Sequence, residues 1–203
     1  MFITIEGIDG SGKSTQAERI FSTLEGSFGY SKVLWTREPG DWTGGDQLRQ
    51  LLLHSNLAHP LSELFLFLVD RCEHVATKIL PALNQGKIVL CERYTDSTIA
   101  YQSWGRGLPR ERLENLFIWS GFPVPDLTLW LDISPELAIT RMKDRGNMDR
   151  IESNGIEFLE RVREGYLALM QSSAGRIKRV DASGDIDNVA KLIKIQLKGV
   201  ILQ

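Results

Sequence analysis

The sequence is poor in cysteine, with only Cys72 and Cys91 among 203 residues. Their spacing fits neither a C-x-x-C motif nor the dense cysteine pattern of a disulfide-linked secreted domain. No uninterrupted apolar run approaches the ~18 residues of a transmembrane helix. Residues 1–30 also lack the basic and apolar regions of a signal peptide. These absences predict a protein of the reducing cytoplasm that does not cross a membrane.

An excess of charge of either sign is missing as well. The 24 Lys and Arg residues nearly balance the 26 Asp and Glu residues, giving a net charge of −2. This balance gives no electrostatic reason to expect nucleic acid or an anionic membrane as partner. The sequence has no repeat, low-complexity tract or linker, and its length lies between one and two average domains. We expect a single domain over residues 1–203.

A phosphate-binding loop near the N-terminus is the most informative feature present. Residues 7–14, GIDGSGKS, match the pattern G-x-x-x-x-G-K-[ST] without a mismatch. They lie between a buried-strand pattern at 2–6 and a helical pattern that begins at residue 16, which is the context that this motif requires. Such a loop surrounds a triphosphate with backbone N–H groups, while Lys13 reaches the β- and γ-phosphates and Ser14 ligates Mg²⁺. The residues expected to bind ATP here are Gly7, Asp9, Gly10, Ser11, Gly12, Lys13, Ser14 and Thr15.

Strand and helix patterns alternate along the rest of the chain. The expected strands are residues 2–6, 32–36, 87–91, 126–132 and 177–180, with helical patterns between them. This alternation predicts an α/β protein with a parallel sheet covered on both faces. The longest helix is expected from Pro60 to about Asn84. Its predicted core face consists of Leu61, Leu64, Phe65, Leu68, Val75, Ile79 and Leu83.

Charged residues follow two of the expected strands. Arg37-Glu38 follow the second strand and Glu92-Arg93 follow the third. Because ligands bind outside the carboxyl ends of strands in open α/β sheets, these side chains belong at the binding edge. Arg37 suits a phosphate, although a strand-ending turn with a solvated ion pair explains it equally well. Glu92 is placed to hold Mg²⁺ or a water bound to it.

Two further features each allow two interpretations. Phe67 and Arg71 project together from the long helix and are suited to stack on a base and bond its edge. Taken alone, the pair favours an aromatic ring at the edge of the core beside a salt-bridged arginine. The basic, glycine-interrupted segment 141–150 is typical of a solvated face. The phosphate loop in the same chain favours instead a set of mobile cations for phosphoryl transfer.

Together these segments resemble the thymidylate kinases of bacteria and archaea, from Ile3 to about Val189. The resemblance is carried by FITIEGIDGSGKST at the phosphate loop, TREPG at 36–40, FLVDRCEH at 67–74, ERYTDSTIAYQ at 92–102, RGNMDRIE at 145–152 and VDASGDI at 180–186. The phosphate loop alone indicates only a large superfamily, whereas the combination is specific.

The resemblance implies a three-layer P-loop kinase fold with a five-stranded parallel sheet and a lid at about 143–152. It also implies Mg·ATP as phosphate donor, dTMP as acceptor, dTDP and ADP as products, and a homodimer. Asp9 would contact the 3′-hydroxyl of the sugar, and Tyr101 would crowd its 2′ position. The implied dTMP-binding residues are Asp9, Arg37, Glu38, Phe67, Arg71, Arg93, Ser97, Thr98, Tyr101 and Gln102.

The resemblance also assigns the donor side and the chemistry. Arg141 and the turn 181–185, including Ser183, would flank adenine, and the metal would be held by Ser14 and Glu92. The implied catalytic residues are Lys13, Arg93, Arg145 and Arg150. The last two belong to the lid, because Gly10 stands where other relatives carry an arginine in the phosphate loop.

The chain departs from the family pattern at two places. Glu92 replaces the usual aspartate before the Arg-Tyr pair, and deoxynucleoside kinases, which also have Glu-Arg here, are therefore the alternative enzymes. A non-catalytic ATP-sensing module is a third hypothesis, but it needs neither lid arginines nor an acceptor pocket. Asp41-Trp42 replace the usual glycine and threonine after REPG, and the sequence assigns them no role.

Overall fold

A five-stranded parallel sheet forms the centre of the protein in the computed structural model, which describes residues 1–146 and 150–201 apart from the side chains of 145, 200 and 201. The strands follow the order β2-β3-β1-β4-β5. They are β1 (Phe2–Glu6), β2 (Val33–Arg37), β3 (Ile88–Glu92), β4 (Leu127–Asp132) and β5 (Ile177–Asp181). The predicted five-stranded parallel sheet is confirmed, with each boundary within about one residue of its expected place.

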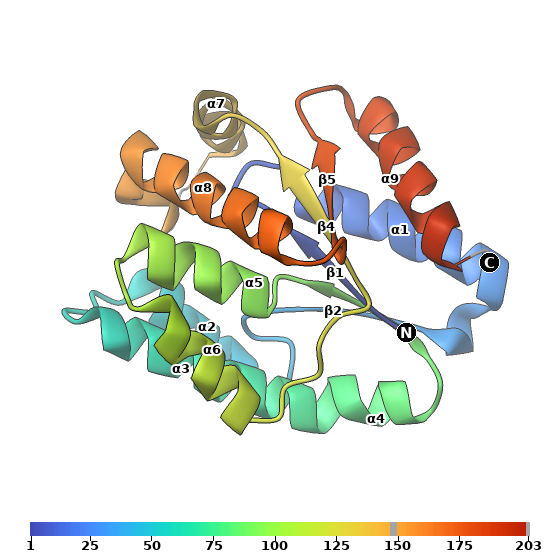
Figure 1. The fold of residues 1–203 in the computed structure, drawn as a ribbon, viewed down its shortest axis with the longest axis horizontal. Helices are drawn as coiled ribbons and strands as arrows, with labels where there is room; N and C mark the ends of the chain where they lie inside the picture. Colours follow the sequence, from blue (N-terminus) through green and yellow to red (C-terminus); the bar gives the residue numbers. More distant parts are fainter. Residues whose placement is uncertain (147–149, 202–203) are drawn as a thin grey trace.

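Helices cover both faces of the sheet (Figure 1). Helices α1 (Lys13–Phe28) and α9 (Ile186–Ile201) pack against each other on one face. The other α-helices are α2 (Gly45–His54), α3 (Pro60–His74), α4 (Leu80–Asn84), α5 (Thr95–Thr98), α6 (Arg110–Trp119), α7 (Pro135–Arg145) and α8 (Ile156–Ser172). Two π-helical segments, η2 (Val75–Ile79) and η3 (Ile99–Gly105), continue α3 into α4 and extend α5. Short 3₁₀ turns are found at η1 (Tyr30–Lys32) and η4 (Glu152–Asn154).

The carboxyl ends of β1, β2 and β3 meet at the edge where the phosphate loop begins. Glu92 lies opposite Ile5 in one neighbouring strand and opposite Arg37 in the other. Beyond the strands, the N–H of Glu38 donates to the carbonyl of Glu92 at 2.8 Å, and the N–H of Arg93 donates to the carbonyl of Ile5 at 3.0 Å. The sheet therefore fixes the backbone of both charged segments that follow β2 and β3.

The predicted core face of the long helix is wrong at two positions. Leu64, Val75 and Ile79 are buried as expected, but Leu61 and Phe65 are 39% and 53% exposed. The buried side chains of α3 are mostly polar, and they are Glu63, Leu64, Asp70, Arg71 and His74. The physical reason is that α3 turns this side toward the charged segment after β2, where ion pairs and hydrogen bonds satisfy the polar groups.

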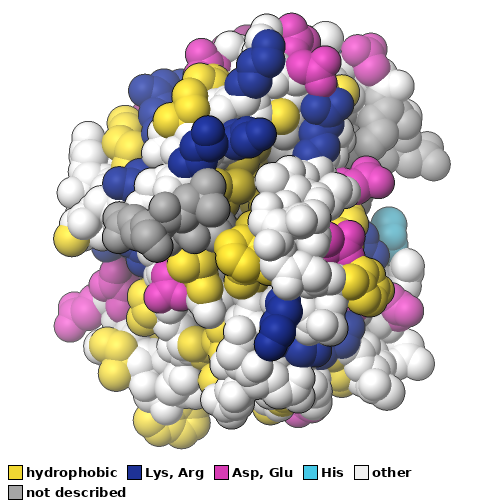
Figure 2. All heavy atoms as spheres, turned by 90° about the vertical axis from the view of Figure 1, so that its right-hand side faces the viewer, with side chains coloured by type: hydrophobic (Ala, Val, Ile, Leu, Met, Phe, Trp, Pro, Cys, Tyr) yellow, Lys and Arg dark blue, Asp and Glu magenta, His cyan; other side chains and the backbone are white. Residues whose placement is uncertain are grey.

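The helices of the described residues are not of the membrane-spanning kind. Among residues 1–146 and 150–201, no helix combines the length and the hydrophobicity that crossing a bilayer requires. Figure 2 looks onto the face covered by α1 and α9, where basic, acidic and hydrophobic side chains are interspersed.

Candidate active site

The phosphate loop connects β1 to α1 and holds its lysine beneath the loop backbone. Lys13 donates from Nζ to the carbonyls of Gly7, at 3.0 Å, and Ile8, at 2.9 Å. Burial, together with the nearby Arg93 cation, lowers the pKa of Lys13 to about 8. A triphosphate bound in the loop would add negative charge beside this buried ammonium, which otherwise has Asp9 at 4.0 Å.

Gly10 occupies a position in the loop that no larger residue fits. Its φ is +80°, and a Cβ built on it would lie 2.5 Å from the carbonyl oxygen of Ala138 in helix α7. Ala138 is itself fully buried. An arginine at this place, as in the relatives with a loop arginine, therefore requires α7 to lie elsewhere.

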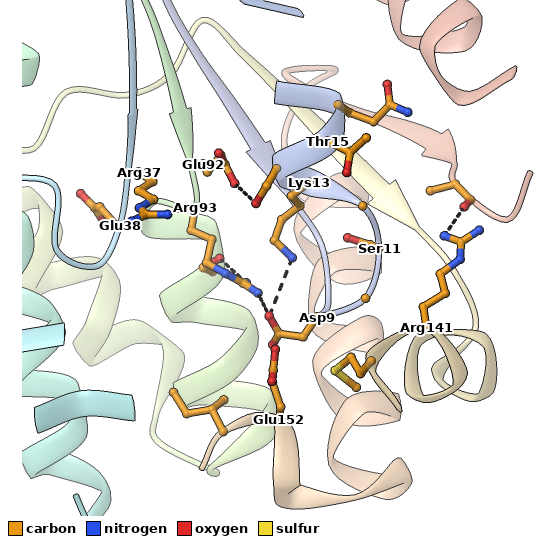
Figure 3. Close-up of a pocket in the computed structure, with 18 of the residues that line it drawn as sticks. Asp9, Ser11, Lys13, Thr15, Arg37, Glu38, Glu92, Arg93, Arg141 and Glu152 are labelled. Carbon is orange, nitrogen blue, oxygen red and sulfur yellow. Dashed lines mark hydrogen bonds and ion pairs between the residues drawn. The ribbon is translucent and has the colours of Figure 1, made fainter. Parts of the chain in front are cut away.

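Asp9, Arg93 and Tyr101 form a cluster beside the loop. Lys13 and Arg93 both point toward Asp9 (Figure 3), and the Arg93 guanidinium donates to Asp9 Oδ1. The hydroxyl of Tyr101 donates to Asp9 Oδ2 at 2.8 Å. Burial alone would raise the pKa of Asp9, but Arg93, Lys13 and Tyr101 together lower it to about 2. Asp9 is thus a fixed carboxylate and a poor proton acceptor.

Arg93 is the more constrained member of this cluster. Its φ is +62°, which a non-glycine residue seldom adopts. The carboxylate of Glu6, fully buried at the end of β1, accepts the next backbone N–H, that of Tyr94, at 2.7 Å. Ser97 donates to the same carboxylate. Burial and the neighbouring Asp96 raise the pKa of Glu6 to about 7. Glu6 therefore supports the strained turn that carries Arg93.

Ser14 and Glu92 lie together at the start of α1 and the end of β3. The Ser14 hydroxyl donates to Glu92 Oε2 at 2.7 Å, and the indole N–H of Trp35 donates to Oε1 at 3.0 Å. Hydroxyl and carboxylate oxygens beside a phosphate loop suit Mg²⁺, which takes few protein ligands and completes its shell with phosphates and water. The described residues contain no group of three or more His, Cys, Asp or Glu side chains that could hold a metal ion.

Glu38, Phe67, Arg71 and Thr98 form what we call the acceptor wall, on the β2 side of the cavity. Arg71 is 1% exposed and donates from Nε to Glu38 Oε2 at 2.8 Å and from Nη1 to Thr98 Oγ1 at 2.9 Å. Phe67, one turn before Arg71, is partly buried and lines the same cavity. The structure thus brings together the aromatic ring and the arginine that the sequence paired.

Arg141 lies on the other side of the phosphate loop. Its guanidinium donates to the carbonyl oxygens of Ala182 at 2.9 Å and of Ser183 and Gly184 at 3.2 Å. The Ser183 hydroxyl instead donates to Asp181, at 2.6 Å. The planar guanidinium and the turn after β5 therefore border one end of the site, as a nucleotide base would require.

One cavity of about 910 Å³ connects these groups. Arg37 and Glu38 lie on one side of it and Arg141 on the other, with the phosphate loop between them (Figure 3). Of the predicted site residues, those that line it are Asp9, Gly10, Ser11, Gly12, Lys13, Ser14, Thr15, Arg37, Glu38, Phe67, Arg71, Glu92, Arg93, Ser97, Thr98, Tyr101, Gln102 and Arg141. Within the described part of the chain, Gly7, Ser183 and Arg150 are not among the lining residues.

The cavity also has walls that the sequence did not reveal. Arg49 and Leu53 of α2 line it, as do Met142 of α7 and Ile151 and Glu152 in the segment before α8. Arg49 donates to the carbonyl of Pro39 at 2.8 Å. These residues come from elements distant in sequence, and the bond from the Arg150 N–H to the Leu53 carbonyl joins the end of α2 to the segment at 150–152. The signals in the sequence were the RGNMDRIE segment, which contains Ile151 and Glu152, and the basic segment 141–150, which contains Met142.

Arg150 is bonded away from the cavity, to groups at the ends of α2 and α3. Its backbone N–H donates to the carbonyl of Leu53 at 3.1 Å. Its guanidinium donates to the carbonyl of Leu52 at 2.9 Å and to the buried Glu63 at 2.8 Å, which also pairs with Arg106. The expected phosphate contact of Arg150 is therefore not present in this arrangement. The side chain of Arg145 and residues 147–149 of the expected lid lie outside the described residues.

Comparison with known proteins agrees with this geometry. Residues 5–193 match the family model described as thymidylate kinase. A thymidylate kinase of Thermosynechococcus vestitus is 45% identical over 205 residues, covering 96% of this chain and 85% of the relative. One of Synechococcus sp. (strain JA-2-3B'a(2-13)) is 46% identical over 191 residues, covering 94% and 90%. The crystal structure of thymidylate kinase from Ehrlichia chaffeensis matches with a TM-score of 0.79 and 33% identity, covering 97% of this chain and 98% of that one. The chain therefore belongs to the thymidylate kinase family.

Proposed function

We propose that this protein transfers the γ-phosphate of Mg·ATP to dTMP, giving dTDP and ADP. The observation that carries the proposal is the single cavity in which the phosphate loop faces Arg93, Arg37 and the acceptor wall. A nucleoside monophosphate has the matching parts, because it offers an anionic phosphate to the arginines and a planar base to Phe67 and Arg71.

The chemistry asks the protein to position and to neutralise charge. The acceptor phosphate is already anionic near neutral pH, so its oxygen attacks without a general base. Lys13 and the loop N–H groups would bind the donor phosphates, while Arg93 and Arg37 would hold the acceptor in line with them. Arg145 and Arg150 are the lid cations proposed for the moving phosphoryl group; Arg150 would have to leave Glu63 to act there.

Mg²⁺ would be held by Ser14 and, directly or through water, by Glu92. When bound, the ion would neutralise charge on the donor phosphates. The protein's own part is to keep the two ligand groups 2.7 Å apart at the mouth of the loop.

A deoxynucleoside kinase fits the site less well. Its acceptor is a neutral hydroxyl that needs a general base. Of the two carboxylates beside the loop, Asp9 has a pKa of about 2, and Glu92 is the one proposed to hold Mg²⁺. Glu6 has a pKa raised to about 7, but it is fully buried and holds the N–H of Tyr94. Two cations on the acceptor side, Arg93 and Arg37, also suit a phosphate better than a hydroxyl.

A coupled ADP-release assay tests the proposal. ATP and Mg²⁺ are supplied with dTMP, dUMP, UMP, AMP or thymidine in separate reactions. We expect the highest kcat/KM with dTMP and detectable turnover of dUMP, because one methyl group discriminates by only about 1–3 kcal/mol. Preferred phosphorylation of thymidine would establish the deoxynucleoside kinase, and ATP binding without turnover of any acceptor would establish a sensor.

The oligomeric state and location belong to the same proposal. Leu61, Phe65 and Val69 lie four residues apart on the outer side of α3 and are 39%, 53% and 50% exposed. We propose that a second copy of the chain covers these three side chains. We also propose that this single-domain enzyme works in the cytoplasm, where its free thiols persist.

Light scattering tests the proposed dimer. It should report a dimer for the wild type and for Leu167→Asp, an exposed position on α8, but a monomer for Phe65→Asp. A monomeric wild type would refute it.

A further inference from the structure

A chain of hydrogen bonds runs behind the acceptor wall and begins at Asp41, one of the three residues that depart from the family pattern. Asp41 accepts from Lys78 Nζ at 2.6 Å and from the Thr36 hydroxyl at 2.6 Å. Partial burial raises its pKa, but the bonds from Lys78 and Thr36 outweigh that and lower the pKa of Asp41. Asp41 is thus an ionised carboxylate that only accepts hydrogen bonds, and the single hydroxyl proton of Thr36 is used in the bond that Thr36 donates to it.

The next member of the chain is His74, which is completely buried. Its Nε2 lies 2.6 Å from Thr36 Oγ1, and its Nδ1 lies 3.1 Å from Glu38 Oε1. Because the Thr36 proton is already directed to Asp41, Nε2 has to be the donor in the first bond.

The second ring nitrogen faces an acceptor too. Glu38 pairs with the guanidinium of Arg71, which approaches Oε2 at 2.8 Å from both Nε and Nη2. The guanidinium takes up Oε2 as an acceptor, and the other carboxylate oxygen, Oε1, is the acceptor that faces His74 Nδ1. Both ring nitrogens of His74 therefore donate, and a ring with two N–H groups is an imidazolium cation.

The charges around the ring balance only if His74 is charged. The carboxylates of this region are Glu38, Asp41 and Asp70, and the other cations are Arg71 and Lys78. Asp70 accepts from the N–H of Gly40 at 2.9 Å and from the indole of Trp42 at 2.7 Å. Burial and the nearby Glu38 raise the pKa of Asp70 to about 6, so it is still largely ionised at neutral pH. The imidazolium supplies the third positive charge.

Three further titratable groups of this region, two cysteines and a tyrosine, carry no charge at neutral pH. Burial raises the pKa of the Cys91 thiol on β3 well above its usual range, and burial also raises the pKa of Tyr94 far above its ordinary value. Cys72 on α3 is exposed, and its pKa is raised as well. None of them provides a charge that could replace that of His74.

We propose that His74 is a positioning residue, held as an imidazolium by Asp41 through Thr36, and that it fixes Glu38 so that Arg71 is oriented toward the acceptor base. The role assigned to Arg71 rests on the proposed function. Asp41 thereby acts on acceptor binding without touching the acceptor, because the bonds pass from Asp41 to Thr36, His74, Glu38 and Arg71 in turn.

The protonation state is tested first, without substrate. In protein with ¹⁵N-labelled histidine, the signals of His74 are assigned with a His74→Gln variant. We expect two protonated ring nitrogens in the wild type at pH 7.5. In Asp41→Ala the Thr36 hydroxyl is free to donate to Nε2, so one protonated nitrogen is expected. Trp42→Phe is the matched control, because it changes the same loop but leaves Asp41 and Thr36 intact, and it should keep both. A single N–H in the wild type would overturn the proposal.

The consequence for Arg71 is read in two ways. We expect slow solvent exchange of the Arg71 Nε–H in the wild type and in Trp42→Phe, and faster exchange in Asp41→Ala. In kinetics, Asp41→Ala should raise the KM for dTMP by about two- to tenfold, the effect of one hydrogen bond, with the KM for ATP unchanged. Because Asp70 and Lys13 titrate in both proteins, the measure is the ratio of the variant's KM for dTMP to that of the wild type, and this ratio should grow with pH between 6 and 8.5.

These readouts separate the two proposals. An Arg71 Nε–H that exchanges equally fast in the wild type and Asp41→Ala would refute the positioning role, whatever the substrate. If both ring nitrogens of His74 are protonated and Arg71 responds as described, yet dTMP is not phosphorylated, only the proposed function fails.

Discussion

Gly10 allows the sharpest test of how the phosphate loop is built. Any residue at this position must adopt a left-handed backbone, with a φ near +80°, and its Cβ would lie 2.5 Å from the carbonyl oxygen of Ala138. The backbone conformation costs an L-residue about 1–2 kcal/mol. Overpacking against a buried helix adds about 1–3 kcal/mol. The free energy of unfolding of Gly10→Ala should therefore be about 2–5 kcal/mol lower than that of the wild type. For a protein of this size, this lowers the melting temperature by roughly 4–20 °C.

Gly12→Ala is the matched control in the same loop. Gly12 has a φ of +87°, but a Cβ there meets no atom within 4 Å. Gly12→Ala should therefore lower the free energy of unfolding only by the backbone contribution of about 1–2 kcal/mol, and the melting temperature by roughly 2–8 °C. Differential scanning calorimetry of both variants without nucleotide measures the difference. Equal shifts for Gly10→Ala and Gly12→Ala would show that the contact with Ala138 is relieved at no cost. Gly10→Arg should likewise fail to restore the rate of an Arg145→Ala variant.

Three other perturbations test the site directly. Phe67→Ala should weaken dTMP binding by about 1–3 kcal/mol and leave ATP binding unchanged, as calorimetric titration would show, if the ring stacks on the base; equal losses would assign Phe67 to the core. Above the Lys13 pKa of about 8, the dissociation constant of ATP should rise by up to about tenfold per pH unit, because the ammonium that binds phosphate loses its proton. A dissociation constant that does not change with pH would contradict this. Arg145→Ala should lower the single-turnover rate by about 10³–10⁵ with little change in dTMP affinity, and Arg150→Ala should do so less, with wild-type transfer by Arg145→Ala as the refuting result.

The parts of the fold that sequence alone predicted are those governed by local patterns. The phosphate loop needs glycines, a lysine and a serine at fixed spacing, and the strand before it and the helix after it read clearly from hydrophobic runs. The pair Phe67 and Arg71 was found because residues one helical turn apart necessarily project together. Both residues line the cavity, and their contact with the acceptor base stays a prediction.

What the sequence could not provide depends on contacts between distant segments. Leu53 and Ile151 lie almost a hundred positions apart, yet both line the cavity, beside the bonds from Arg150 to the end of α2. The role of Asp41 was equally hidden, because nothing local connects it to Lys78 or, through Thr36, to His74. In both cases long polar side chains make the connection, and their partners cannot be read from periodicity.

Helix α3 also bears on how this protein tolerates mutation. Most surface helices keep hydrophobic side chains inside and polar ones outside, and scoring by hydropathy assumes that arrangement. Here Phe65 and Val69 face outward, whereas Asp70 and His74 are fully buried and hydrogen-bonded. Replacing a buried, bonded polar group leaves its partners without hydrogen bonds, which costs more than trimming an exposed ring. Along α3 of the folded chain, the positions that tolerate substitution least are therefore the buried hydrophilic ones. A design guided by hydropathy would replace these buried polar residues with hydrophobic ones and would thereby destabilise the protein.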